Sequence, residues 1–190
     1  MKMNVFVMPL LIALLGCVIS CTKEQTPLVH NPEIAAQLAG GWQESLTFDT
    51  EISTDADNPQ LVTGTITSRA VSVMTLNEDQ HFSIESRQEV VSYVPVAGTK
   101  ALSEDELRLY FNQMVTITGT FAAADKFIEF DRQWISVNGS APVAFESYKE
   151  AASLTGGDMQ RALWDLVDEQ LTILTADGAS TKETVYTRIN

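Results

Sequence analysis

The chain has few of the residue types on which disulfides and zinc sites depend. It is 190 residues long and contains two cysteines and two histidines. Both cysteines, Cys17 and Cys21, lie near the start, so the rest of the chain can form neither a disulfide nor a thiolate metal site. His30 and His81 lie far apart in the sequence, which argues against zinc. A domain without such crosslinks has to be stabilised by a hydrophobic core.

Positive charge is scarce as well. The chain has 12 Lys and Arg against 25 Asp and Glu, which gives a formal net charge of −13 at pH 7. A protein with this charge is repelled by nucleic acid and by anionic membrane surfaces. We therefore expect no nucleic-acid partner, and any membrane attachment has to come from something other than surface charge.

Motifs for catalysis and cofactor binding are missing. Gly40-Gly41 precedes a strand rather than a helix, so it is not a phosphate-binding loop. The loop Asp55–Asn58 spaces its carboxylates as calcium sites do, but Pro59 stands at the next ligand position. We predict that the protein is not an enzyme and holds no metal or cofactor. A hydrolase based on carboxylates is the alternative, and it needs two acidic residues that face one cleft.

The first 21 residues have the layout of an export signal. A basic residue, Lys2, precedes an apolar run, and a small residue, Ser20, precedes Cys21. The core of the run, Val5–Leu15, is shorter than the roughly 20 residues of a membrane-spanning helix. It also contains Pro9, which destabilises a helix interior. The layout is typical of bacterial lipoprotein signals, which are cut just before a cysteine.

Two cysteines compete for the cleavage site. Cys17 fits the usual motif better, but cleavage there would leave the apolar pair Val18-Ile19 outside the membrane. We therefore favour Cys21, with residues 1–20 as signal peptide and residues 21–37 as a tether. Diacylglycerol and an acyl chain such as palmitate on Cys21 would anchor the protein firmly. An ordinary secreted protein with two incidental cysteines is the alternative.

The anchor implies a location in the cell envelope. Thr22, which follows Cys21, is not the aspartate that favours inner-membrane retention in some bacteria. We therefore expect the outer membrane, on its periplasmic or its surface face.

Apolar and polar residues alternate from Trp42 onwards, which is the signature of β-strands. In the first strand, Trp42, Leu46 and Phe48 fall on one face and polar residues fall on the other. The total is seven to ten strands, mostly in sequential hairpins whose connections are too short for parallel crossovers. We therefore predict a mainly β fold, an antiparallel up-and-down β-barrel, because closure removes exposed strand edges. A sandwich is the alternative.

One or two short helices are expected among the strands. Ser103 and Glu106 form a capping box, and an apolar stripe at helical spacing runs to Met114. These signals predict a helix over residues 103–114, and a second is plausible over 143–154. Residues 159–174 fit either a helix or a hairpin that turns at Asp168-Glu169.

In the hairpin over residues 61–94, the size and polarity of the side chains on one face change along the strands. If Leu76 pairs with Phe82, this face is bulky near the turn and small and polar further out. Inside a barrel, such a face leaves unfilled volume with polar groups around it, as in many small-molecule pockets. The candidate pocket residues are Ser72, Ser86, Gln88 and Ala70. The alternative is a β-bulge that turns Val71 and Val73 inward instead.

Three segments carry a family resemblance. The G-x-W element Gly40-Gly41-Trp42, the hairpin Met74–Ile84 and the ending Trp164–Arg188 resemble the lipocalin-like (calycin-type) lipoproteins of Gram-negative bacteria. The resemblance implies that residues 38–190 form a lipocalin-like barrel, and it favours the hairpin within residues 159–174. It also implies that Trp42 plugs one end of the barrel and that Arg188 packs over it. In secreted lipocalins, by contrast, a single helix follows the strands.

These observations lead to one expected function and one alternative. We expect a membrane-anchored lipoprotein whose barrel, without enzymatic activity, binds a small apolar ligand or a partner protein of the envelope. The alternative is a structural or interaction subunit of an envelope complex, with a filled barrel.

Overall fold

The computed structural model describes residues 28–54, 60–151, 159–177 and 180–189. The predicted signal peptide, the predicted lipid-attachment residue Cys21 and the acidic loop Asp55–Asn58 lie outside these residues. So does the first part of the predicted tether.

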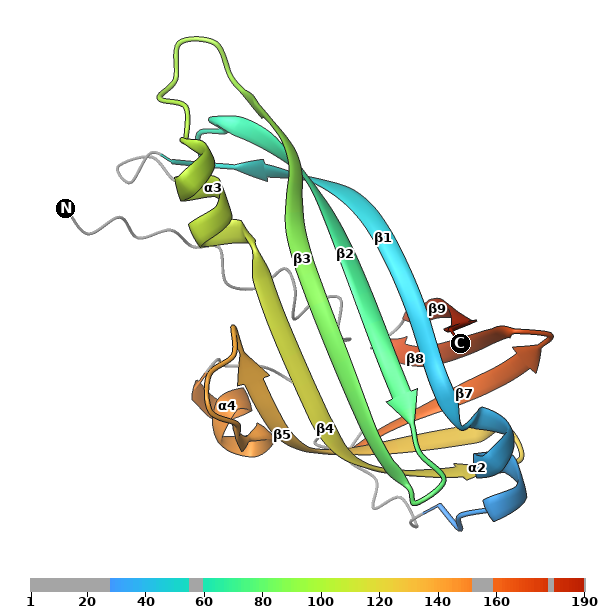
Figure 1. The fold of residues 1–190 in the computed structure, drawn as a ribbon. Helices are drawn as coiled ribbons and strands as arrows, with labels where there is room; N and C mark the ends of the chain where they lie inside the picture. The colour runs from blue at the N-terminus through green and yellow to red at the C-terminus, as the bar shows by residue number, and fades with distance from the viewer. Residues whose placement is uncertain (1–27, 55–59, 152–158, 178–179, 190) are drawn as a thin grey trace.

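Eight antiparallel strands of the described chain close into an up-and-down barrel (Figure 1). They are β1 (Gly40–Ile52), β2 (Gly64–Leu76), β3 (His81–Pro95), β4 (Gln113–Ala124), β5 (Phe127–Val137), β7 (Met159–Val167), β8 (Gln170–Asp177) and β9 (Ser180–Ile189). Each pairs with the next along the chain, and β9 pairs back with β1. A two-residue strand, β6 (Val143–Ala144), adds to β5. The predicted mainly β barrel is confirmed.

The ambiguous stretch over residues 159–174 forms a hairpin. Val167 of β7 pairs with Gln170 of β8, which leaves Asp168 and Glu169 as a two-residue turn. Asp168 has a φ of 55°, a conformation that Asp adopts more readily than most residues. Because β7 also pairs with β5, strand pairing on both sides decides against the helix.

Three short helices lie in the described residues: α2 (Pro32–Leu38), α3 (Glu104–Phe111) and α4 (Phe145–Ala151). None of them is long and apolar enough to cross a membrane. α3 has the predicted capping box of Ser103 and Glu106, but the prediction that Met114 belongs to this helix is wrong. Met114 lies in β4, where its N–H donates to Asn138 Oδ1 at 2.8 Å. Strand pairing thus overrides the helical spacing of this side chain.

Helix α2 corrects the expectation that residues 21–37 form only a tether. Asn31 caps it, because its Oδ1 accepts the N–H of Glu33 at 3.0 Å, and Pro32 occupies the first helical position. Ala35 and Leu38 of this helix are buried in the main core. α2 is therefore part of the folded barrel and covers one of its ends (Figure 1).

The seam between β1 and β9 is short. The two strands pair only from Gly41 with Ile189 to Gln43 with Thr187, at the end that α2 covers. β1 pairs with β2 as far as Ile52, so its other edge has no partner strand beyond Gln43 within the described residues. Figure 1 shows the consequence: β1, β2 and β3 continue as a tall curved sheet, while β7, β8 and β9 diverge from it.

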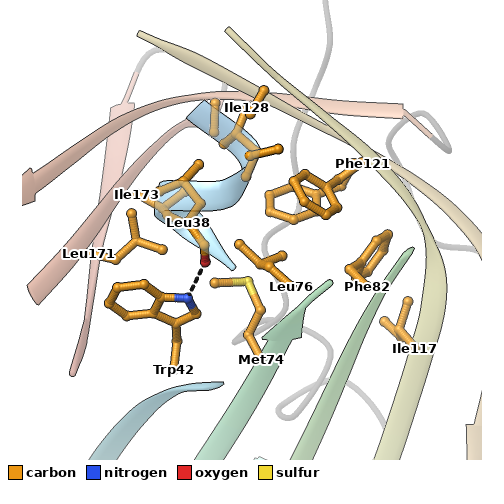
Figure 2. Packing of buried hydrophobic residues seen from close by; sticks show 14 of the residues in the cluster. Leu38, Trp42, Met74, Leu76, Phe82, Ile117, Phe121, Ile128, Leu171 and Ile173 are labelled. Carbon is orange, nitrogen blue, oxygen red and sulfur yellow. Dashed lines mark hydrogen bonds between the residues drawn. The ribbon is translucent and has the colours of Figure 1, made fainter. Parts of the chain in front are cut away.

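Two apolar clusters lie on the inner face, one towards each end. The larger cluster surrounds Trp42 beside α2 (Figure 2) and includes Leu38, Trp42, Met74, Leu76, Phe82, Ile117, Phe121, Ile128, Leu171 and Ile173. The smaller cluster joins α3 to the far ends of β1 and β2 through Ile52, Ile66, Leu107 and Phe111. The candidate pocket lies on the stretch of sheet between these two clusters.

Gly119 allows β4 and β5 to pair across an irregularity. The register shifts between Thr118 and Gly119, and a Cβ at Gly119 would collide with the backbone carbonyl oxygen of Asp131. We expect Gly119→Ala to lower the free energy of unfolding by about 3 kcal/mol, because the carbonyl cannot move without disturbing the pairing. Urea denaturation followed by circular dichroism measures this loss.

The matched control is Gly98→Ala. Gly98 has a φ of 84° and open space around it, so this variant loses only the roughly 1 kcal/mol that left-handed backbone costs an alanine. Equal losses in the two variants would contradict the steric explanation.

Candidate functional site

The four predicted pocket residues lie together on the inner face of the sheet. The predicted register is confirmed, with Ser72 opposite Ser86 and Ala70 opposite Gln88. The hydroxyl oxygens of Ser72 and Ser86 are 2.8 Å apart, and Gln88 Nε2 donates to Ser68 Oγ at 3.4 Å. Polar side chains here are thus bonded to one another across β2 and β3.

The alternative reading of this hairpin is wrong. A β-bulge does occur, but it lies between Thr67 and Ser68, beyond the candidate residues. Val71 and Val73 therefore stay on the outer face, where they line a surface groove together with charged residues such as Arg87 and Glu85. The alternation of inward and outward side chains is therefore unbroken at all four candidate pocket residues.

The inner face is open to water on its β1 side. Opposite residues of an antiparallel pair project to the same face, so Leu46, which pairs with Ala70, points inward. Leu46 is nevertheless 41% exposed, whereas Ala70 is 4% exposed. Glu44 and Phe48, its neighbours on this face, are also only partly buried. Water therefore reaches the inner face beside the edge of β1 that β9 leaves uncovered.

We call this region the lumen and define it by its lining on β1, β2 and β3. These residues are Glu44, Leu46, Phe48, Ser68, Ala70, Ser72, Ser86 and Gln88. Ser68, Ser86 and Gln88 are buried, whereas Ser72 is partly exposed.

The lumen contains a carboxyl group whose environment is unusual. Partial burial raises the pKa of Glu44, and the charge of Lys182 on β9 opposes this effect. Burial also raises the pKa of Tyr186 on β9 above its usual range, and the Glu44 charge raises it further. Tyr186 is therefore a protonated phenol at neutral pH, able to donate a hydrogen bond.

Glu44 is not among the site residues predicted from the sequence. Trp42, Leu46 and Phe48 are predicted to share one face, and strict alternation puts Glu44 on that face too. An acidic residue within an apolar face was the available signal. Along the described parts of β1, β2 and β3, Glu44 is the one inward carboxylate, so the pair that a carboxylate hydrolase needs is not present on these strands.

The predicted plug residues meet at the closed end of the barrel. The Arg188 guanidinium carbon lies 4.4 Å from the centre of the Trp42 ring. Its nitrogens donate to the carbonyl oxygens of Gln37 at 2.9 Å and Ala39 at 3.2 Å, at the end of α2. Trp42 Nε1 donates to the Leu38 carbonyl oxygen at 2.8 Å, the bond drawn as a dashed line in Figure 2. One arginine thus ties the last strand to both the first strand and its preceding helix.

No family model and no curated protein matches the chain. The described residues show a β-barrel of lipocalin-like architecture. Among them, no group of three or more His, Cys, Asp or Glu is placed to hold a metal ion.

We expect Arg188→Met to lower the free energy of unfolding by about 2–3 kcal/mol, since it removes two charge-assisted hydrogen bonds and a cation–π contact. Arg87→Met is the control, because Arg87 lies on the outer surface and its ion pair with Glu85, at 3.7 Å, is exposed. That variant should stay within about 0.5 kcal/mol of the wild type. Urea denaturation compares the two, and an unaffected Arg188→Met would contradict the role of this contact.

Proposed function

We propose that the protein is a lipid-anchored, non-enzymatic binding protein of the bacterial cell envelope whose lumen holds a small, mainly apolar molecule. The observation that supports this proposal best is the exposure of Leu46. A side chain on the inner face of a filled barrel would be buried, whereas Leu46 is 41% exposed. Apolar walls with a few convergent polar groups are the usual composition of a small-molecule site.

The anchoring part of the proposal rests on the sequence. The apolar run before Cys21 and the polar residues after it favour cleavage at this cysteine and acylation of its sulfur and amino groups. The net charge of −13 makes an electrostatic attachment to anionic lipids unfavourable, so the acyl chains supply the membrane affinity. We propose the outer membrane as the site of attachment.

Metabolic labelling with an alkyne analogue of palmitate tests the anchor. We expect Cys21→Ser to abolish labelling, because the acylated sulfur is lost, and Cys17→Ser to retain it. In-gel fluorescence after click chemistry measures the label. The reverse pattern would move the cleavage site to Cys17, and an unlabelled wild type would refute the anchor altogether.

Native mass spectrometry of the intact protein, released from membranes, tests the lumen. We expect the wild type to carry a bound small molecule and Leu46→Trp to carry about tenfold less, because the indole occupies the space beside Ala70. Leu46 is exposed, so the larger ring should fit with a stability change of no more than about 0.5 kcal/mol.

Thr47→Trp is the matched control, because Thr47 is the exposed neighbour on the outer face of the same strand. It should leave occupancy unchanged. A wild type without any retained molecule, or equal occupancy in the two variants, would count against a ligand-binding lumen.

A second candidate function, an interaction subunit of an envelope complex, is favoured by one observation. Phe127 and Leu163 form a cross-strand pair on the outer face and are 44% and 43% exposed. In that case in-cell crosslinking would capture an envelope partner in the wild type and lose it in Phe127→Ser.

A further inference from the structure

We infer that the ligand is an amphipathic molecule whose polar group donates hydrogen bonds and carries no negative charge, and that Glu44 holds this group. A long-chain amine or alcohol has this chemistry. The inference rests on the proposed binding function and adds the head-group chemistry and its position in the lumen.

Three polar side chains of the lumen form one level across β1, β2 and β3, while Gln88 and Ser68 lie further along the inner face. Glu44 of β1 pairs with Ser72 of β2, which pairs with Ser86 of β3. Opposite residues share a face, so these three side chains lie side by side on the inner surface. The two serine hydroxyls bond to each other at 2.8 Å, and Glu44 and Ser72 are the partly exposed members of the row. A polar group that enters from the β1 side therefore meets Glu44 and Ser72 first.

From this level towards α3, the inner face carries large apolar side chains on β1, beside the buried polar residues Gln88 and Ser68. The next pair on the inner face is Leu46 with Ala70, and Phe48 with Ser68 follows it. Beyond them lies the smaller apolar cluster, with Ile66 and Phe111. A chain that follows the inner face from Glu44 thus passes two large apolar side chains before it reaches a packed cluster. This sequence of surfaces matches a molecule with one polar end and one apolar end.

The charges around the polar level decide the kind of head group. The Glu44 carboxylate accepts hydrogen bonds and donates none when ionised. A ligand carboxylate placed beside it would face a like charge, within a protein whose net charge is −13. Lys182 is the cation that acts on Glu44, and its charge already favours the ionised form of that residue. An ammonium or hydroxyl group can instead donate directly to the carboxylate.

The ionised carboxylate of Glu44 also destabilises the folded state. Its partial burial raises the pKa of the carboxyl group, so the ionised form is less stable in the folded protein than in the unfolded chain. Unfavourable ionisable groups of this kind are concentrated at binding and catalytic sites. A ligand donor at Glu44 would replace the water that burial removes from the carboxylate.

Photoaffinity labelling of the full-length protein in phosphatidylcholine nanodiscs tests the inference. Three probes share one diazirine-bearing dodecyl chain and differ in the head group, which is an amine, a hydroxyl or a carboxylate. Mass spectrometry quantifies crosslinks to peptides of β1, β2 and β3. Partition of each probe into the lipid is the same for every variant, so ratios between variants report the lumen. Glu44→Gln is the test variant.

In the wild type, we expect the amine and hydroxyl probes to crosslink about tenfold more than the carboxylate probe, which corresponds to one charge-assisted contact. Glu44→Gln should lower the amine-to-carboxylate ratio about five- to tenfold and change the hydroxyl yield little. Glu44→Asp, which keeps the charge, should retain the wild-type order. Glu51→Gln, at an exposed position on the same strand, should leave all three yields unchanged.

Two results would overturn the inference: a carboxylate probe that crosslinks the wild type as well as the amine does, or an unchanged ratio in Glu44→Gln. Both leave the proposed binding function standing, because the lumen is labelled. If no probe labels the lumen of the wild type, the proposed function itself fails and the inference falls with it.

Discussion

The contact between Arg188 and Trp42 is the point on which the rest of the barrel depends. Eight strands can close into a ring only if the last one meets the first, and here they meet over three residue pairs. The guanidinium group covers the Trp42 ring at 4.4 Å and bonds to two carbonyl groups at the end of α2. One side chain thus contacts the first strand, the end of α2 and the large apolar cluster at the point where the barrel closes.

The short seam also explains why the barrel has an accessible inner surface. Beyond Gln43 the described part of β1 pairs with one strand rather than two, so one edge of β1 is left without a partner strand. The register across β1, β2 and β3 arranges the inner face in layers: apolar at Met74, polar at Ser72, mixed at Ala70 and Ser68, and apolar again at Ile66. A polar layer followed by layers that contain large apolar side chains suits a ligand with a distinct head group.

Patterns within short stretches of sequence correctly predicted the parts of the structure that depend on contacts between segments adjacent in the chain. The hairpin register followed from apolar alternation on both sides of one turn, and with it came the four pocket residues. The start of α2 was equally local, because Asn31 and Pro32 are a helix-initiating pair, but these residues were assigned to the tether. The approach of Tyr186 to Glu44 has no such signal, because it depends on closure between strands at opposite ends of the domain.

Closure by β9 also has a consequence for how the chain folds. The hydrogen bonds of Arg188 to Gln37 and Ala39 join residues separated by 151 and 149 positions. Contacts of such long range form late, because the entropy lost in closing a large loop is not recovered until the final segments dock. The hairpins of β1 to β5 can form first, but the Trp42 ring is not covered by Arg188 until β9 pairs with β1. The last step of folding is therefore the pairing of β9 with β1, which closes the barrel.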